Sequence, residues 1–187
     1  TYCDSSAVSQ LNQPWETIPV TPSNEELQKI RLRAVPFTNN YIAQTHGEEG
    51  MFATLFFGVL NPETGSLYYI NGGHEPLYLI NSDGVKQKID PTGPAVGMWP
   101  DTTYDIGQIK MEPGDMLIGY TDGVTEARSP ADEIFTRSRL RSLIEQPFTT
   151  ASEMLDRVRA NLFTFIDIAP RSDDVTMLAV ERIVNTG

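Results

Sequence analysis

The sequence predicts an α+β domain in which helices cover a sheet assembled mainly from β-hairpins. Apolar residues recur at helical spacing in residues 24–46 and again in residues 137–166. Short apolar runs separated by Pro, Gly, Asn and Asp turns fill residues 51–120, and another run follows at 175–183. The expected order is therefore a helix, about six antiparallel strands, two helices and a final strand.

The composition fits one globular domain. The chain has 187 residues, of which 40% are hydrophobic and 21% are charged, enough for one sizeable core. A net charge of −11 argues against a surface that binds nucleic acid. The longest apolar run, residues 51–60, is too short to span a bilayer, and no leader opens the chain, so we expect a soluble, cytoplasmic protein. The single cysteine, Cys3, excludes an internal disulfide and fits a reducing compartment.

Residues 1–23 hold three prolines among polar residues, and we expect a loop or linker there, with the domain beginning at residue 24. Ser23 or Asn24 should cap the first helix, because two acids follow in the first turn, where they oppose the helix dipole. Pro36 should kink or restart this helix, since it lacks a backbone N–H. The helical pattern ends near His46, which is expected to act as a cap.

Five short strands are expected next, four of them in two consecutive hairpins. An Asp83-Gly84 turn closes the second hairpin. The aromatic and aliphatic run at residues 51–57 is expected to belong to the core. The predicted strands are residues 51–60, 66–71, 76–81, 85–89 and 103–109.

Two helices follow a surface loop at residues 127–133. The first is expected at residues 137–145, with its apolar side chains on one face. The second should be capped by Thr149 or Thr150, because Glu153 stands in its first turn. Pro170 should close it, and a last strand should run over residues 175–183.

Acidic residues stand at the ends of two predicted strands. One apolar strand ends on Thr121-Asp122-Gly123, and Asp173-Asp174 immediately precede the last strand. Carboxylates are the hard oxygen ligands that Mg²⁺ and Mn²⁺ prefer. Asp-Gly pairs also commonly just reverse the chain, and acids before a strand can simply solvate its end. The two acidic strand ends together favour a metal site more than either one does alone.

Two other polar residues have open roles. His74 could act as a catalytic base, since its charge changes near neutral pH. Its glycine and proline neighbours favour a structural role in the connection between the hairpins. Glu126 either orients the loop after Asp122 or lies on the surface. The sequence contains no phosphate-cradling glycine loop of the Walker type.

Five ordered sequence blocks are more specific than any one of these features. Taken together they closely resemble the SpoIIE/RsbU-like branch of the bacterial metal-dependent serine/threonine protein phosphatases, also called PPM or PP2C-like. The resemblance extends over residues 24–183. The blocks are residues 51–60, Tyr69-Ile70-Asn71-Gly72-Gly73-His74-Glu75-Pro76, Pro113-Gly114-Asp115, residues 120–127, and Asp173-Asp174-Val175-Thr176.

The resemblance implies a PP2C-like α-β-β-α sandwich of two antiparallel sheets flanked by helices, with two Mn²⁺ or Mg²⁺ ions in a cleft. It implies a phosphatase that removes phosphate from a phosphorylated anti-sigma-factor antagonist of the STAS type, using a metal-activated water instead of a side-chain nucleophile. Carried over onto this sequence, Asp122 and Asp173 are metal ligands. Asp174 and Gly123, next to them in the sequence, are further candidate metal ligands, and Asn71, His74 and Glu126 support the cleft or its loops.

The sequence departs from the family pattern at two places. The family carries an earlier Asp-x-x-Gly-x-Gly segment whose aspartate bridges the two metals, and nothing before Met51 matches it. We therefore expect residues 24–187 to be the C-terminal two-thirds of the domain, inactive or nearly inactive alone, downstream of a sensor or receiver domain and able to form a homodimer. A catalytically dead scaffold that binds a phosphoprotein or STAS partner is the alternative. Thr136 also stands where relatives usually have glycine, which should alter the loop beside the cleft.

Overall fold

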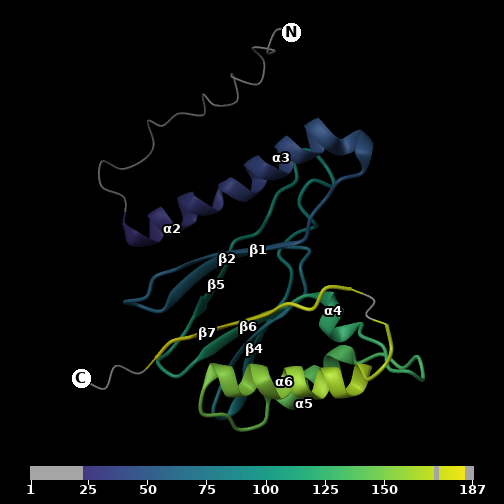
Figure 1. Cartoon of the computed structure of the whole chain (residues 1–187). Helices are drawn as coiled ribbons and strands as arrows, with labels where there is room; N and C mark the ends of the chain where they lie inside the picture. The colour runs from purple at the N-terminus through teal and green to yellow at the C-terminus, as the bar shows by residue number, and fades with distance from the viewer. Residues whose placement is uncertain (1–22, 171–172, 184–187) are drawn as a thin grey trace, which may run out of the picture.

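The computed structural model describes residues 23–170 and 173–183, so the predicted linker lies almost entirely outside the described residues. Two antiparallel sheets are stacked between two pairs of helices, as Figure 1 shows. One sheet has the order β1-β2-β5, and the other has the order β4-β3-β6-β7. None of the described helices combines the length and apolar character needed to cross a membrane. The strands are β1 (Leu55–Leu60), β2 (Ser66–Gly72), β3 (Leu77–Asn81), β4 (Gly84–Ile89), β5 (Gly107–Lys110), β6 (Met116–Tyr120) and β7 (Met177–Glu181).

The N-terminal helices follow the local signals in the sequence. Ser23 and Glu26 form a reciprocal capping box at the start of α2 (Asn24–Leu32). The helix breaks at Arg33 and restarts as α3 (Ala34–His46), so the predicted restart is confirmed. Pro36 lies in the first turn of α3, where a missing N–H removes no intrahelical hydrogen bond. The helix ends at His46 as predicted, but Gly47 and not His46 is its C-cap residue. The ring Nδ1 of His46 lies 3.2 Å from Glu49 Oε2 in the following 3-10 turn, η3 (Gly47–Glu49).

The C-terminal helices also begin close to their predicted residues. They are α5 (Thr136–Ile144) and α6 (Ala151–Ile166), and Thr150 caps α6 by accepting the Glu153 N–H. The helix ends at Ile166, four residues before Pro170, because Asp167 adopts a positive φ of 48°. A one-turn helix, α4 (Asp122–Thr125), lies where only a turn was predicted.

Three strand predictions extend too far. Residues 51–60 form a strand only from Leu55, and Met51 and Phe52 are 53% and 61% exposed, so their assignment to the core was wrong. Residues 103–106 are not in the strand, because Asp105 donates its N–H to the Thr92 carbonyl and the Tyr104 hydroxyl bonds Asn39. The last strand begins at Met177 and not at residue 175.

Apolar side chains form three layers that hold the sandwich together. Alternate residues of β3 point in opposite directions, so Leu77 and Leu79 pack between the sheets while Tyr78 and Ile80 pack under α5 and α6. The third layer lies between α2, α3 and the outer face of the smaller sheet, and contains Leu32, Val35, Tyr68, Ile70 and Val96. Burial on both faces explains why β2, β3 and β6 are so apolar.

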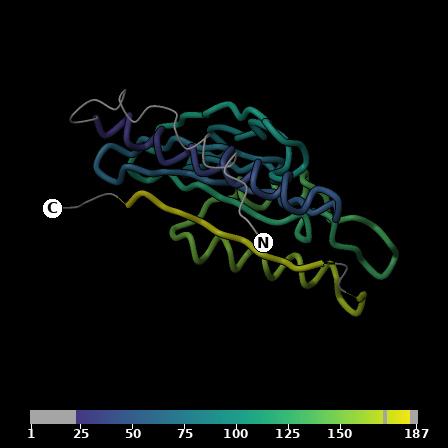
Figure 2. Tube along the Cα trace, turned by 90° about the horizontal axis from the view of Figure 1, so that it is seen from above, coloured from purple at the N-terminus to yellow at the C-terminus, as the bar shows by residue number. Residues whose placement is uncertain are grey.

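The sandwich has an apolar slot of about 230 Å³ between the edge strands β1 and β7. Figure 2 shows β7, in yellow, as the outermost strand on one side, with α6 projecting beyond it. Leu178 and Val180 on β7 are 64% and 36% exposed beside the slot. An apolar slot bordered by two edge strands favours pairing with another chain. Its lining consists of Phe56, Gly58, Leu60, Leu67, Leu77, Met111, Leu117, Gly119, Leu178 and Val180.

We predict that this chain self-associates through the slot. Sedimentation at micromolar concentration should give a dimer, and Leu178→Lys should shift it to monomer, because a charged side chain on an edge strand opposes pairing. Ile168→Lys is the matched control, since Ile168 is 86% exposed and does not line the slot. A stable wild-type monomer under these conditions would contradict the prediction.

Thr136, at the start of α5, has a strained backbone. Its φ is +71°, a conformation that a β-branched residue rarely adopts and that glycine adopts freely. Thr136→Gly should therefore raise the free energy of unfolding by about 1 kcal/mol. Urea unfolding measures this change, and Thr136→Ala, which keeps a Cβ, serves as the control. An equal gain from both variants would show that the strain is not the cause.

Candidate metal centre

The first acidic segment is the turn that leaves β6. The helical turn α4 starts at Asp122, with the Glu126 N–H donating to the Asp122 carbonyl at 2.8 Å. Val124 is fully buried and anchors the turn beneath the surface, while Asp122 itself is exposed. One carboxylate oxygen of Asp122 accepts the Gly123 N–H at 2.9 Å. The turn therefore fixes the position of this acid at the end of a buried strand.

Thr121 joins the first acidic segment to the second. Its N–H donates to the Thr176 carbonyl at 3.0 Å, and its hydroxyl donates to the Asp174 carbonyl at 2.9 Å. The Thr176 N–H in turn donates to the Thr121 hydroxyl oxygen at 3.0 Å. These three hydrogen bonds bring together segments that are more than 50 residues apart in the chain. Sequence reasoning missed this role of Thr121.

Gly123 lies in direct contact with the second segment. A Cβ placed on Gly123 would lie 2.4 Å from the Asp174 carbonyl oxygen and 3.4 Å from Asp173 Cβ. Only a residue without a side chain permits this approach. The structure therefore brings the predicted residues Asp122, Gly123, Asp173 and Asp174 into one region. Asp173 and Asp174 are both exposed, and one Asp173 carboxylate oxygen accepts the Asp174 N–H at 2.7 Å.

The connection between β2 and β3 holds the predicted residues Asn71 and His74. Asn71 is fully buried, and its side-chain oxygen accepts the His74 N–H at 2.9 Å. His74 Nδ1 lies 3.4 Å from the Thr54 hydroxyl. Glu75 extends the connection toward α5, where its carboxylate accepts two hydrogen bonds from Arg137, at 2.9 and 2.8 Å. This bidentate pair raises the pKa of the Arg137 guanidinium above its ordinary value.

An open hollow of about 520 Å³ lies beside the acids. It is formed where the end of α4, the loop after it and the start of α5 meet. The predicted residues Asp173 and Glu126 both contribute to its wall, and so do two arginines that sequence reasoning missed. Its lining residues are Thr125, Glu126, Arg128, Ile134, Arg137 and Asp173.

The acids match Mg²⁺ or Mn²⁺ in chemical type but do not complete a site. Carboxylate oxygens are the ligands that these ions prefer, and Mg²⁺ commonly keeps several waters. Within residues 23–170 and 173–183, no three Asp, Glu, His or Cys side chains gather in a group that could hold an ion. An ion held by Asp122 and Asp173 therefore needs further ligands from water or from protein that the described residues do not supply.

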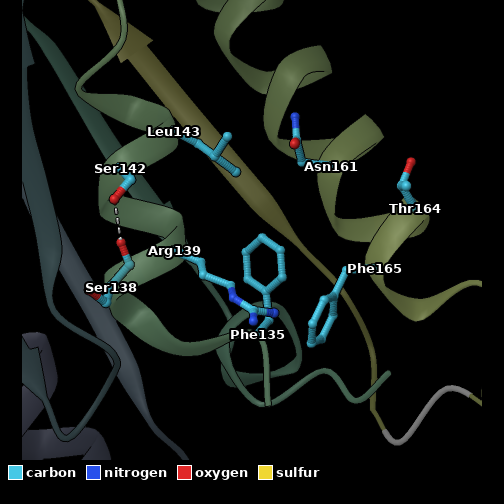
Figure 3. A pocket seen from close by; sticks show the side chains of 8 residues that line it. All are labelled: Phe135, Ser138, Arg139, Ser142, Leu143, Asn161, Thr164 and Phe165. Atoms are coloured by element: carbon cyan, nitrogen blue, oxygen red, sulfur yellow. Dashed lines mark hydrogen bonds between the residues drawn. The ribbon is translucent and has the colours of Figure 1, made fainter. Parts of the chain in front are cut away.

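A second hollow, of about 460 Å³, lies between α5 and α6 (Figure 3). In it the Arg139 guanidinium lies over the Phe165 ring, 4.5 Å from the ring centre. No carboxylate is among its described lining residues, so they supply none of the charged oxygen ligands that divalent cations prefer. The lining consists of Phe135, Ser138, Arg139, Ser142, Leu143, Asn161, Thr164 and Phe165.

Comparison with known proteins identifies relatives of this chain. A family model described as stage II sporulation protein E (SpoIIE) matches residues 27–183. Protein IcfG from Synechocystis sp. is 52% identical over 151 residues, which are 81% of this chain and 24% of IcfG. Phosphoserine phosphatase RsbU from Bacillus subtilis is 29% identical over 147 residues, or 78% of this chain and 43% of RsbU. The chain thus spans less than half the length of these curated relatives.

Solved structures show the same arrangement of sheets and helices. The phosphatase domain of SpoIIE from Bacillus subtilis, in a Mn-presoaked crystal, matches with a TM-score of 0.62 at 17% sequence identity. The match covers 91% of this chain and 79% of that domain. The predicted fold class, two antiparallel sheets flanked by helices, is confirmed.

Proposed function

Because this chain belongs to the SpoIIE family of PP2C-like phosphatases, as its sequence blocks indicated, we propose that the complete protein is a Mn²⁺- or Mg²⁺-dependent phosphoserine/phosphothreonine phosphatase. The observation that carries this proposal is the contact between the two acidic segments, made by Thr121 and Gly123. This contact brings the turn that carries Asp122 against the segment that carries Asp173, and Asp173 lines an open hollow.

Each residue of the centre has a distinct task in the proposed reaction. Asp122 and Asp173 hold the ions through their carboxylates, and Asp174 and the Gly123 backbone keep these acids together. When bound, such ions would supply a nucleophilic water at neutral pH and would neutralise charge on the phosphoryl oxygens. No serine or cysteine nucleophile is required. Because both acids are exposed, a phosphorylated side chain on another protein can reach them.

The proposed substrate is a phosphorylated regulatory protein of the STAS type in bacterial signalling. RsbU, a relative of this chain, is named a phosphoserine phosphatase. An upstream sensor or receiver domain is proposed to control the complete protein, as the relatives are longer than this chain. Asn71, His74 and Glu126 are proposed to support the cleft, where Asn71 orders the loop and Glu126 lines the hollow.

A catalytically dead scaffold is the second candidate. The observation that favours it is the lack of an Asp-x-x-Gly-x-Gly segment in this sequence, since the family uses that aspartate to bridge two metals. Function varies freely on one fold, so the fold does not decide between the two. Such a segment encoded upstream of Thr1 favours the enzyme, and its absence there favours the scaffold.

A phosphate-release assay tests the proposed function. The complete protein should release phosphate from a phosphoserine STAS protein with Mn²⁺ or Mg²⁺ present and stop when EDTA is added. Adding Mn²⁺ back should restore release, which excludes damage by the chelator. Binding of the phosphoprotein without any release, at every metal concentration, would overturn the enzyme and support the scaffold.

A further inference from the structure

The hollow next to Asp173 has the size and position of a substrate site. Its volume of about 520 Å³ lies within the range of about 300–1,000 Å³ typical of ligand pockets. A smaller hollow next to it shares Arg128 and Asp173 in its wall and also includes Gly123. Arg128 therefore lies beside the candidate metal centre in both hollows.

A phosphorylated substrate needs positive charge in a region that is rich in acids. Glu126 and Asp173 line the hollow, and among the described residues its cationic lining residues are Arg128 and Arg137. The Arg137 guanidinium already donates two hydrogen bonds to the carboxylate of Glu75, whose side chain is only 15% exposed. Arg137 is thus committed to holding the β2–β3 connection against α5.

Arg128 is held much more weakly. Its Nη1 donates to Asp132 Oδ1 at 2.7 Å, but the two side chains are 47% and 80% exposed. Exposed pairs of this kind contribute about 0–1 kcal/mol. A phosphate dianion accepts two parallel hydrogen bonds from a guanidinium and carries more charge than one carboxylate. Phosphate should therefore displace Asp132 from Arg128.

The backbone beneath Arg128 is fixed by a small hairpin of residues 127–135. Arg128 pairs with Ile134 in an isolated β-bridge, and the Phe135 N–H donates to the Ala127 carbonyl at 2.8 Å. Ala127 and Phe135 are buried, which anchors both ends of the hairpin. A binding group on an anchored backbone loses less conformational entropy when its ligand arrives.

We propose that Arg128 binds the phosphoryl group of the phosphoprotein in this hollow, and that Asp132 occupies the guanidinium until substrate displaces it. This inference rests on the proposed phosphatase function and names a substrate-binding residue for it. Arg137 is a positioning residue that holds the opposite wall through Glu75.

Steady-state kinetics of the complete protein with a phosphoserine STAS protein and Mn²⁺ test the inference. Arg128→Ala should lower kcat/KM by about 10- to 100-fold, since hydrogen bonds to charged groups contribute about 1.5–3 kcal/mol. It should also weaken product inhibition by inorganic phosphate. Arg128→Lys should have a kcat/KM between those of the wild type and Arg128→Ala, because lysine keeps the positive charge but cannot donate two parallel hydrogen bonds. Mn²⁺ affinity measured by calorimetry should stay unchanged.

Asp132→Asn should act in the opposite direction. It removes the internal competitor, so inorganic phosphate should inhibit more tightly and KM should fall. Asn tolerates the positive φ of 62° at this position, so the loop should keep its shape. A purely structural role of the Arg128–Asp132 pair predicts impairment by both variants, and that result would overturn the inference.

Arg139→Ala is the matched control. Arg139 is also 47% exposed and also pairs with a carboxylate, Glu133, but it lines the hollow between α5 and α6. Its kinetics should equal those of the wild type. An unchanged kcat/KM in Arg128→Ala would overturn only the inference about Arg128. If the wild-type protein shows no Mn²⁺-dependent phosphate release, both the proposed function and this inference are overturned.

Discussion

Asp122→Asn in the complete protein is expected to abolish Mn²⁺-dependent phosphate release. The loss should exceed about 100-fold, because even the outer partners of metal ligands contribute about 10- to 100-fold. The amide keeps the size of the side chain and can still accept the Gly123 N–H, but it loses the negative charge that holds a divalent cation. The measurement is the rate of phosphate release from a phosphoserine protein, with the unfolding midpoint recorded alongside.

The unfolding midpoint should not change, since Asp122 is exposed. Asp83→Asn is the matched control, because Asp83 is an exposed acid in another Asp-Gly pair, in the β3–β4 turn. Unchanged turnover in Asp122→Asn would remove Asp122 from the metal centre.

A calorimetric titration with Mn²⁺ tests the chain itself. The described residues gather acids from only two segments, so one weak binding event is expected. In the Asp122→Asn variant of the chain, this Mn²⁺ binding should be lost. Tight binding of two ions would contradict the proposal that further ligands come from outside this chain.

Asp115→Ala is expected to cost about 3 kcal/mol of the free energy of unfolding, at the lower end of the range for breaking a buried ion pair. The Asp115 side chain is 3% exposed and accepts hydrogen bonds from Lys86 Nζ at 2.6 Å and from the Glu112 N–H at 2.8 Å. The substitution leaves both donors without this acceptor. Lys86 is 34% exposed and can regain water, which limits the cost. Urea unfolding measures the change.

Asp90→Ala separates burial from charge. The Lys88–Asp90 pair has the same 2.6 Å distance, but its side chains are 49% and 61% exposed. Its loss should cost under about 1 kcal/mol. Equal costs for the two variants would mean that burial of Asp115 does not matter. Asp115 belongs to a sequence block that indicated the family, and its contacts give that block a structural role next to β6.

Elements with local signals were predicted closely from the sequence. The capping box of Ser23 and Glu26, the Thr150 cap and the Asp83-Gly84 turn each involve contacts within a few residues, so a single stretch of sequence contains all of their causes. The predictions were wrong where distant contacts replaced local ones. Tyr104 and Asp105 bond Asn39 and Thr92 and leave the strand pattern that their sequence suggests.

The sequence by itself determined the fold class, the order of the elements and the acids at two strand ends. These depend on apolar periodicity and on residue type, which a linear pattern records. Only the tertiary structure decided how the acids meet: Thr121 reaches Asp174 and Thr176, 53 and 55 residues away, and Gly123 admits the Asp174 carbonyl. The pairing of Arg137 with Glu75 across 62 residues likewise leaves Arg128, of the two described arginines that line the hollow, without a bidentate carboxylate partner. Such contacts depend on how the two sheets stack, and no local pattern encodes that.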